Sequence, residues 1–70
     1  MKVFVVTMYR YADRDKHSYV LGIFSDKGLA INAGQDEANY RGGKYEPEVV
    51  EFEIDDMKSK TTVFKLERLI

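Results

Sequence analysis

The sequence predicts an α+β fold, namely a four-stranded antiparallel sheet (ββαββ) with one helix packed on one face. Residues 2–11 contain a run of apolar, mostly β-branched and aromatic residues (Val3, Phe4, Val5, Val6 and Met8) on both alternating faces, which is typical of a central strand with something packed on each side. Residues 25–41 form a helical stretch with capping residues at both ends, and residues 46–55 alternate strictly between apolar and polar. A helix crossing over from the second strand returns the third strand beside the first, which gives the spatial order 2-1-3-4.

Length and composition restrict the class of protein. The chain has 70 residues, a net charge of −1, one His and no Cys, so we expect a single domain over residues 1–70 without thiol catalysis or Cys-based zinc sites. A domain this short buries only about 60% of its unfolded surface, which leaves a well-packed core or self-association to stabilise it. The charge argues against a generic nucleic-acid binder, and neither a membrane span nor a signal-peptide plan is visible. We therefore expect a cytoplasmic protein that needs no cofactor.

The first two strands are expected to form a hairpin. Residues 11–17 are dense in charge and lack bulky aliphatic side chains, which indicates an exposed turn. Residues 18–24 alternate, with Tyr19, Leu21 and Ile23 on one side and Val20, Gly22 and Phe24 on the other.

The helix has a start signal and a stop signal. Ser25 is the expected N-cap, and Phe24 with Leu29 stand at the positions of a hydrophobic staple. The helix should run to about Tyr40 or Arg41, where residues 42–43 are both Gly. Its apolar positions are mostly small, which predicts a helix axis close to the sheet: Ala30, Ala33, Gly34 and Ala38, with Leu29 and Ile31 larger.

The last two strands are predicted from alternation. One face of residues 46–55 carries Val50, Phe52 and Ile54, and the other carries Val49, Glu51, Glu53 and Asp55, which indicates a half-buried strand. Residues 61–70 alternate as well, with a helix as the alternative, and Lys65 is placed to pair with Glu51 or Glu53 across the strands.

One helix covers one face of such a sheet. The opposite face would still carry part of the first strand's apolar set, including Val3, Val5 and Tyr9. An exposed apolar sheet face usually marks an interface, so we expect a homodimer or a higher oligomer. The alternative is a scattered apolar surface without a partner.

Several of these stretches also resemble a family. The runs at residues 3–6 and 20–25, the spaced Ala30 and Ala33, and the Glu-Phe-Glu-Ile-Asp strand at residues 51–55 look like a group of short uncharacterised proteins of bacteria and phages. The resemblance covers about residues 3–55. It implies a fold and a phage or mobile-element origin, and no catalytic residues come with it.

The candidate binding site is the segment 40–47. Residues 42–43 free the backbone for close approach, Arg41 and Lys44 supply donors for phosphate or carboxylate, and Tyr40 and Tyr45 offer flat faces for a base. Arg10 belongs to a second aromatic and basic group near the hairpin loop. The alternatives are an ordinary helix C-cap for the segment and a solvated tip for the loop.

Other chemistry is weakly indicated. Glu51, Glu53 and Asp55 form an acidic row that would imitate DNA phosphates, or else an ordinary solvent face neutralised by Lys58, Lys60 and Lys65. No carboxylate pair lies in a predicted cleft for catalysis, and the alternating Asp13, Asp15 and His17 are either a metal pattern or a chance surface arrangement.

The sequence thus predicts a non-catalytic binding protein, an oligomer that captures a nucleotide-type ligand between protomers through Tyr40, Arg41, Lys44, Tyr45 and Arg10. The alternative function is an inhibitor that grips a host protein with the acidic strand or the bare sheet face.

Overall fold

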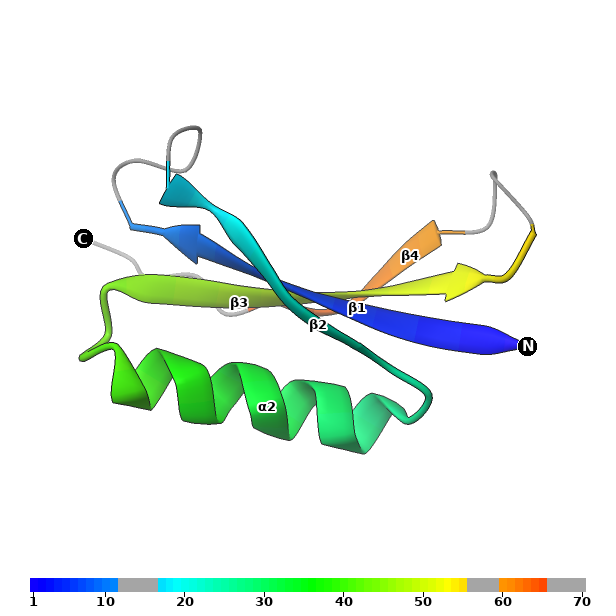
Figure 1. Ribbon diagram of the computed structural model, residues 1–70, viewed down its shortest axis with the longest axis horizontal. Helices are drawn as coiled ribbons and strands as arrows, with labels where there is room; N and C mark the ends of the chain where they lie inside the picture. The colour runs from blue at the N-terminus through cyan, green and yellow to red at the C-terminus, as the bar shows by residue number, and fades with distance from the viewer. Residues whose placement is uncertain (12–16, 56–59, 66–70) are drawn as a thin grey trace.

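The computed structural model describes residues 1–11, 17–55 and 60–65. Within these ranges the elements are β1 (Lys2–Arg10), β2 (Tyr19–Phe24), α2 (Lys27–Tyr40), β3 (Tyr45–Glu53) and β4 (Lys60–Lys65). The strands form one antiparallel sheet in the order β2-β1-β3-β4, and α2 lies across one face of it (Figure 1). This confirms the predicted fold class, the strand order and the internal position of β1. Residues 60–65 of the last segment are a strand, while residues 66–70 lie outside the described residues.

The core lies between α2 and the two central strands. Phe4, Val6 and Met8 alternate along β1 and are buried, and Val49 of β3 is fully buried opposite Val6. Apolar burial at these positions is the main force that holds the helix on the sheet. The residues of α2 that are buried against this layer are all small: Ala30, Gly34 and Ala38.

Small residues bring the helix close to the sheet, as the sequence predicts. A Cβ atom placed on Gly34 would lie 2.8 Å from the Cβ of Pro47 and 3.3 Å from Cγ1 of Val6. Carbon atoms normally pack at about 3.5–4.0 Å, so only Gly fits at this position with the present spacing.

The face of β3 that is buried differs from the expected one. Alternation placed Val50 and Ile54 on the protected side, yet Val49 is the fully buried residue and Ile54 is 43% exposed. The register sets Val49 beside Val6, on the side of the sheet that α2 covers. Because β1 is apolar on both faces, its pattern does not decide which face receives the helix.

Each edge strand contains a bulge. The register shifts between Val6 and Thr7 on β1, which leaves Leu21 as the extra residue of β2. A second shift between Val49 and Val50 on β3 leaves Val63 as the extra residue of β4.

The bulge in β2 overturns the simple alternation expected for that strand. Ile23 was expected on the side of Tyr19, but Ile23 pairs with Val5 and Val20 pairs with Thr7, on the face away from α2. Val20 and Ile23 are 58% and 65% exposed.

The helix begins one residue later than predicted. Asp26, not Ser25, is the N-cap, because its side chain accepts a hydrogen bond from the backbone N–H of Leu29 at 3.0 Å. This shift removes the predicted staple, and Leu29 is exposed while Phe24 packs against the core.

The glycine pair ends the helix as expected. Gly42 and Gly43 adopt φ values of 69° and 78°, in the left-handed region that favours Gly. Their N–H groups donate to the carbonyls of Asn39 and Ala38 at 3.1 and 3.0 Å. These are the two bonds of a Schellman cap.

Candidate functional site

An arginine–tyrosine cluster lies where three strand ends meet the end of the helix. The register brings Arg10 at the end of β1 beside Tyr45 at the start of β3, while Tyr19 at the start of β2 pairs with Met8. The last turn of α2 adds Glu37, and its C-cap is Arg41. We name the arginine–tyrosine cluster as Arg10, Tyr19, Glu37, Arg41 and Tyr45.

The rings and guanidinium groups of the cluster are in mutual contact. The Tyr19 and Tyr45 rings meet edge to face with centroids 5.4 Å apart. The Arg41 guanidinium carbon lies 5.0 Å from the Tyr45 centroid and 5.5 Å from the Tyr19 centroid. The Arg10 guanidinium carbon lies 5.9 Å from the Tyr45 centroid. Both distances to Tyr45 are within the range of cation–π attraction.

Hydrogen bonds hold one side of the cluster. The Tyr19 hydroxyl donates to the Glu37 carboxylate, and Nε of Arg41 donates to the Tyr19 oxygen at 3.3 Å. Nε of Arg41 also lies 3.7 Å from the Glu37 carboxylate. Burial raises the pKa of the Tyr19 hydroxyl, and the hydrogen bond to Glu37 adds to the rise. The hydrogen bond to Tyr19 raises the pKa of the Arg41 guanidinium, so Arg41 stays charged.

Charge in the cluster is unbalanced. It contains two guanidinium groups and one carboxylate, and Glu37 faces Arg41. Arg10 has the Tyr45 ring as its contact and no carboxylate partner among the described residues. The cluster therefore presents an excess positive charge next to an aromatic ring, although the whole chain is slightly acidic.

The structure brings together three of the five predicted site residues. Arg10, Arg41 and Tyr45 are in the cluster, whereas the Tyr40 side chain is 84% exposed and Lys44 is also exposed. The carbonyl of Lys44 accepts a hydrogen bond from the N–H of residue 11 at 2.8 Å, which ties the start of β3 to the end of β1.

Two members of the cluster were missed by the sequence analysis. Glu37 stands four residues before Arg41, a spacing that by itself predicts an ion pair on a helix. Tyr19 gives no such local signal, because only the pairing of β2 with β1 brings it to this end of the sheet.

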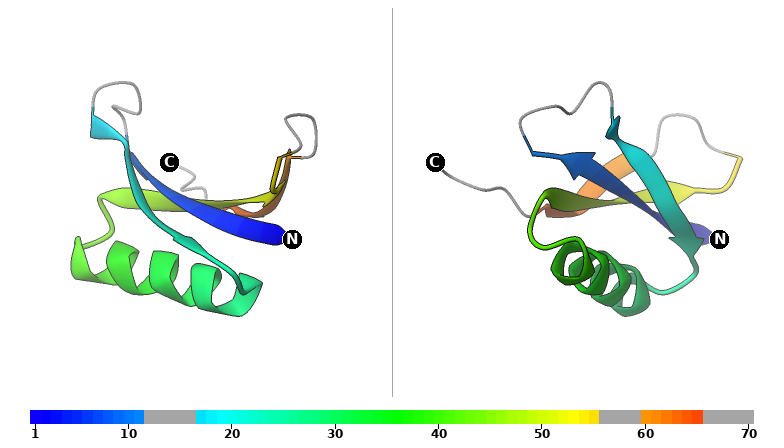
Figure 2. Two further views of the ribbon diagram at one scale, coloured as in Figure 1. Left: turned by 45° about the vertical axis from the view of Figure 1, so that its right-hand side comes forward. Right: turned by 60° about the vertical axis from the view of Figure 1, so that its left-hand side comes forward.

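A second candidate surface is the sheet face opposite α2. No described element covers this face, and Figure 2 shows α2 on the other side of the sheet. Short side chains in the middle and longer ones around them leave a shallow hollow of about 350 Å³. It is lined by Val5, Thr7, Tyr9, Glu48, Val50, Phe52, Lys60 and Thr62. We call this surface the open face, and we include in it Val3, Val20 and Ile23, which share its register.

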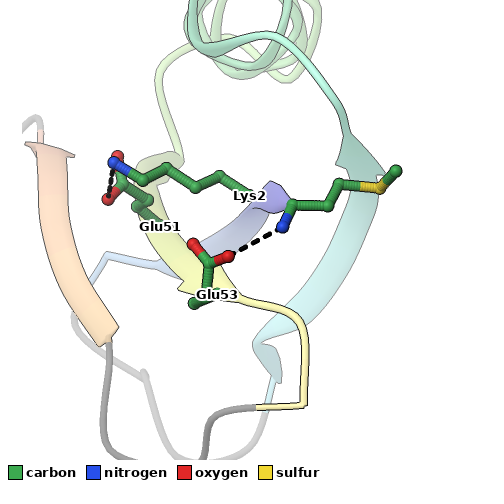
Figure 3. Close-up of polar contacts among 4 residues, drawn as sticks. Lys2, Glu51 and Glu53 are labelled. Atoms are coloured by element: carbon green, nitrogen blue, oxygen red, sulfur yellow. Dashed lines mark hydrogen bonds and ion pairs between the residues drawn. The ribbon is translucent and has the colours of Figure 1, made fainter.

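The acidic residues of β3 are partly neutralised at the N-terminal end of β1. Nζ of Lys2 lies 3.5 Å from the Glu51 carboxylate, and the amino group of Met1 lies 2.7 Å from the Glu53 carboxylate (Figure 3). The expected cross-strand pairing of Lys65 with Glu51 or Glu53 does not form, because the strand register sets the Cα of Lys65 opposite that of Glu48.

The fold and these surfaces define a small α+β domain whose sheet carries its helix on one face. No group of three His, Asp or Glu residues suited to a metal ion occurs within residues 1–11, 17–55 and 60–65, and Asp13 and Asp15 lie outside them. Nor is any helix of these ranges long and apolar enough for a transmembrane segment.

Comparisons with protein families, with characterised proteins and with solved structures find no match to this chain. The resemblance to short bacterial and phage proteins stays a prediction.

Proposed function

We propose that this protein is a non-catalytic binding protein that acts as a homo-oligomer and captures a nucleotide-type ligand at the arginine–tyrosine cluster. The observation that carries the ligand is the placement of two guanidinium groups around one ring, Arg10 and Arg41 on Tyr45. Guanidinium groups bind phosphate and carboxylate through paired N–H donors, and an aromatic ring stacks on a base.

The two arginines have different roles in this proposal. Arg41 is held by Tyr19 and Glu37, so it fixes the position of the Tyr45 ring. Arg10 makes no ion pair among the described residues and keeps its donors for the ligand. The exposed Lys44 and Tyr40 flank the turn that leads into β3 and add a third cation and a third ring nearby.

Calorimetry with purified protein tests the ligand. We expect binding of at least one nucleotide from a panel of nucleoside mono-, di- and triphosphates. Because a hydrogen bond to a charged group contributes about 1.5–3 kcal/mol, Arg10→Ala should weaken that binding by roughly 10- to 100-fold. Arg41→Ala should weaken it too. Lys27→Ala removes the same charge at the exposed start of α2 and should leave binding unchanged. Absence of binding across the whole panel would remove the proposed ligand.

The open face supports the homo-oligomer. It contains a contiguous set of apolar side chains from β1, β2 and β3, and Val20 and Ile23 are more than half exposed. Contiguous apolar surface of this kind on a soluble domain marks an interaction site. Native mass spectrometry over a range of protein concentrations should show a dimer or higher oligomer. A protein that stays monomeric would favour the alternative, in which the same face docks a different protein.

The acidic-strand version of that alternative has less support. Glu51 and Glu53 have Lys2 and the Met1 amino group beside them, so the row is not a free line of negative charge.

A further inference from the structure

We infer that the open face is the contact surface of a two-fold symmetric homodimer in which Glu48 of each copy pairs with Lys60 of the other. This inference rests on the homo-oligomer of the proposed function and names its partner and geometry. It does not depend on the nucleotide-type ligand.

Charge is distributed on the open face in a self-complementary way. Glu48 of β3 lies near one end of the hollow and Lys60 of β4 near the other, where Lys60 pairs in register with Phe52. Neither residue has an ion-pair partner within the described ranges. Lys60 is one strand across from Phe52, which is four residues along β3 from Glu48, so the backbones at Glu48 and Lys60 are about 14 Å apart. A negative and a positive group at opposite ends of one surface meet each other when a second copy is turned end for end.

Symmetry fixes how the copies would lie. The two-fold axis would lie between the two sheets, run across the strands and pass near Val50 and Thr62. It would place Glu48 of each copy over Lys60 of the other, which gives two equivalent contacts. Such an axis leaves the strands of the two sheets nearly antiparallel, close to the crossing of about 30° found in aligned sheet packing. From the spacing of strands and residues, the same axis would place Phe52 of each copy above Val5 and Thr7 of the other copy, where the hollow lies.

The size of the face is adequate for a weak dimer. Its strands are six to nine residues long, so four of them outline roughly 15–20 Å by 20–30 Å. The surface buried on the two copies together, including the relief of the side chains, would approach the total of about 1,000 Å² that a specific interface requires. Among the described residues, the apolar side chains on the helix-covered face of the sheet are buried or partly buried against the core.

Charge reversal distinguishes this pairing from other dimers. Glu48→Lys alone gives two Lys–Lys contacts in a symmetric dimer, and Lys60→Glu alone gives two Glu–Glu contacts. Each single variant should raise the dimer dissociation constant at least tenfold in sedimentation experiments. The double variant should restore the dimer. An equimolar mixture of the two single variants should form a heterodimer, because both of its contacts again join opposite charges.

Two control variants and three readouts separate the Glu48–Lys60 pairing, the homo-oligomer and the nucleotide-type ligand. Asp36→Lys and Lys27→Glu make the same charge changes on exposed positions of α2 and should not alter dimerisation, and circular dichroism checks that every variant is folded. A wild-type dimer that both single reversals leave intact overturns the Glu48–Lys60 pairing alone. A wild-type protein that is monomeric at every concentration overturns the pairing and the homo-oligomer together. Nucleotide binding by calorimetry is a separate readout from both.

Discussion

Replacing Gly34 by Ala tests how closely α2 lies on the sheet. In an exposed helix position this change stabilises a helix by about 1 kcal/mol, because Gly has the higher conformational entropy in the unfolded chain. At Gly34 the new methyl group would lie 2.8 Å from Cβ of Pro47 and 3.3 Å from Cγ1 of Val6. Pro47 is a fully buried ring within β3, so it has no flexible end that moves aside.

The expected magnitude follows from these two opposing effects. Overpacking a filled core costs about 1–3 kcal/mol, and a contact nearly 1 Å inside the normal carbon separation belongs to the upper part of that range. After the gain in helix propensity, we expect Gly34→Ala to lower the free energy of unfolding by about 1–2 kcal/mol. For a domain of this size, that corresponds to a fall in Tm of roughly 4–16 °C.

Urea unfolding followed by circular dichroism measures the change. The control is Asn32→Ala, which raises helix propensity at an exposed position of the same helix without adding an atom to the core, and it should raise stability by a few tenths of a kcal/mol. If Gly34→Ala is as stable as the control or more so, the close approach of α2 to Pro47 is wrong.

Two further predictions concern single hydrogen bonds. Asp26→Ala should lower the free energy of unfolding by about 0.5–2 kcal/mol because it removes the cap of the Leu29 N–H, whereas Ser25→Ala should be nearly neutral; equal losses in urea unfolding would contradict the assignment of the N-cap. Folding raises the pKa of the Tyr19 hydroxyl, so the folded state holds this proton more tightly than the unfolded chain does. The stability that the protonated hydroxyl contributes is therefore complete below the unfolded pKa of about 10 and is lost as the pH rises through the folded pKa. Stability of Tyr19→Phe should therefore decline less than that of the wild type at alkaline pH, and a constant difference between the two would refute the shift.

The order of elements was predictable because local signals specify it. The double-sided apolar run of β1, the Gly42–Gly43 stop and the alternation of β3 each depend on neighbouring residues. Those signals also place β1 inside the sheet, because a strand that is apolar on both faces needs neighbours.

Which face of each strand is buried was not predictable from the same signals. Val49 and Val50 are equally apolar, and only their position relative to Val6 and α2 makes Val49 the core residue. The extra residue Leu21 likewise has no local sequence signature, yet it changes the side on which Ile23 lies.

The candidate site shows the same division. Arg41 and Tyr45 are close in sequence, so one local segment predicts both of them as site residues. Arg10 was predicted from a separate group of basic and aromatic residues near the hairpin loop. Their convergence with Tyr19 depends on the strand register, which no local pattern reports. The turn after the helix was identified correctly, while the packed rings beside it required the tertiary structure.

The extra residues Leu21 and Val63 both lie on the outermost strands, one at each margin of the sheet. A bulge at a margin twists the strand and disturbs its row of unpaired N–H and C=O groups, which hinders another chain from continuing the ladder. Growth by strand addition, the route to fibres, is thereby discouraged on both flanks. Irregular margins on both sides of the sheet therefore protect the folded domain from open-ended polymerisation through strand pairing.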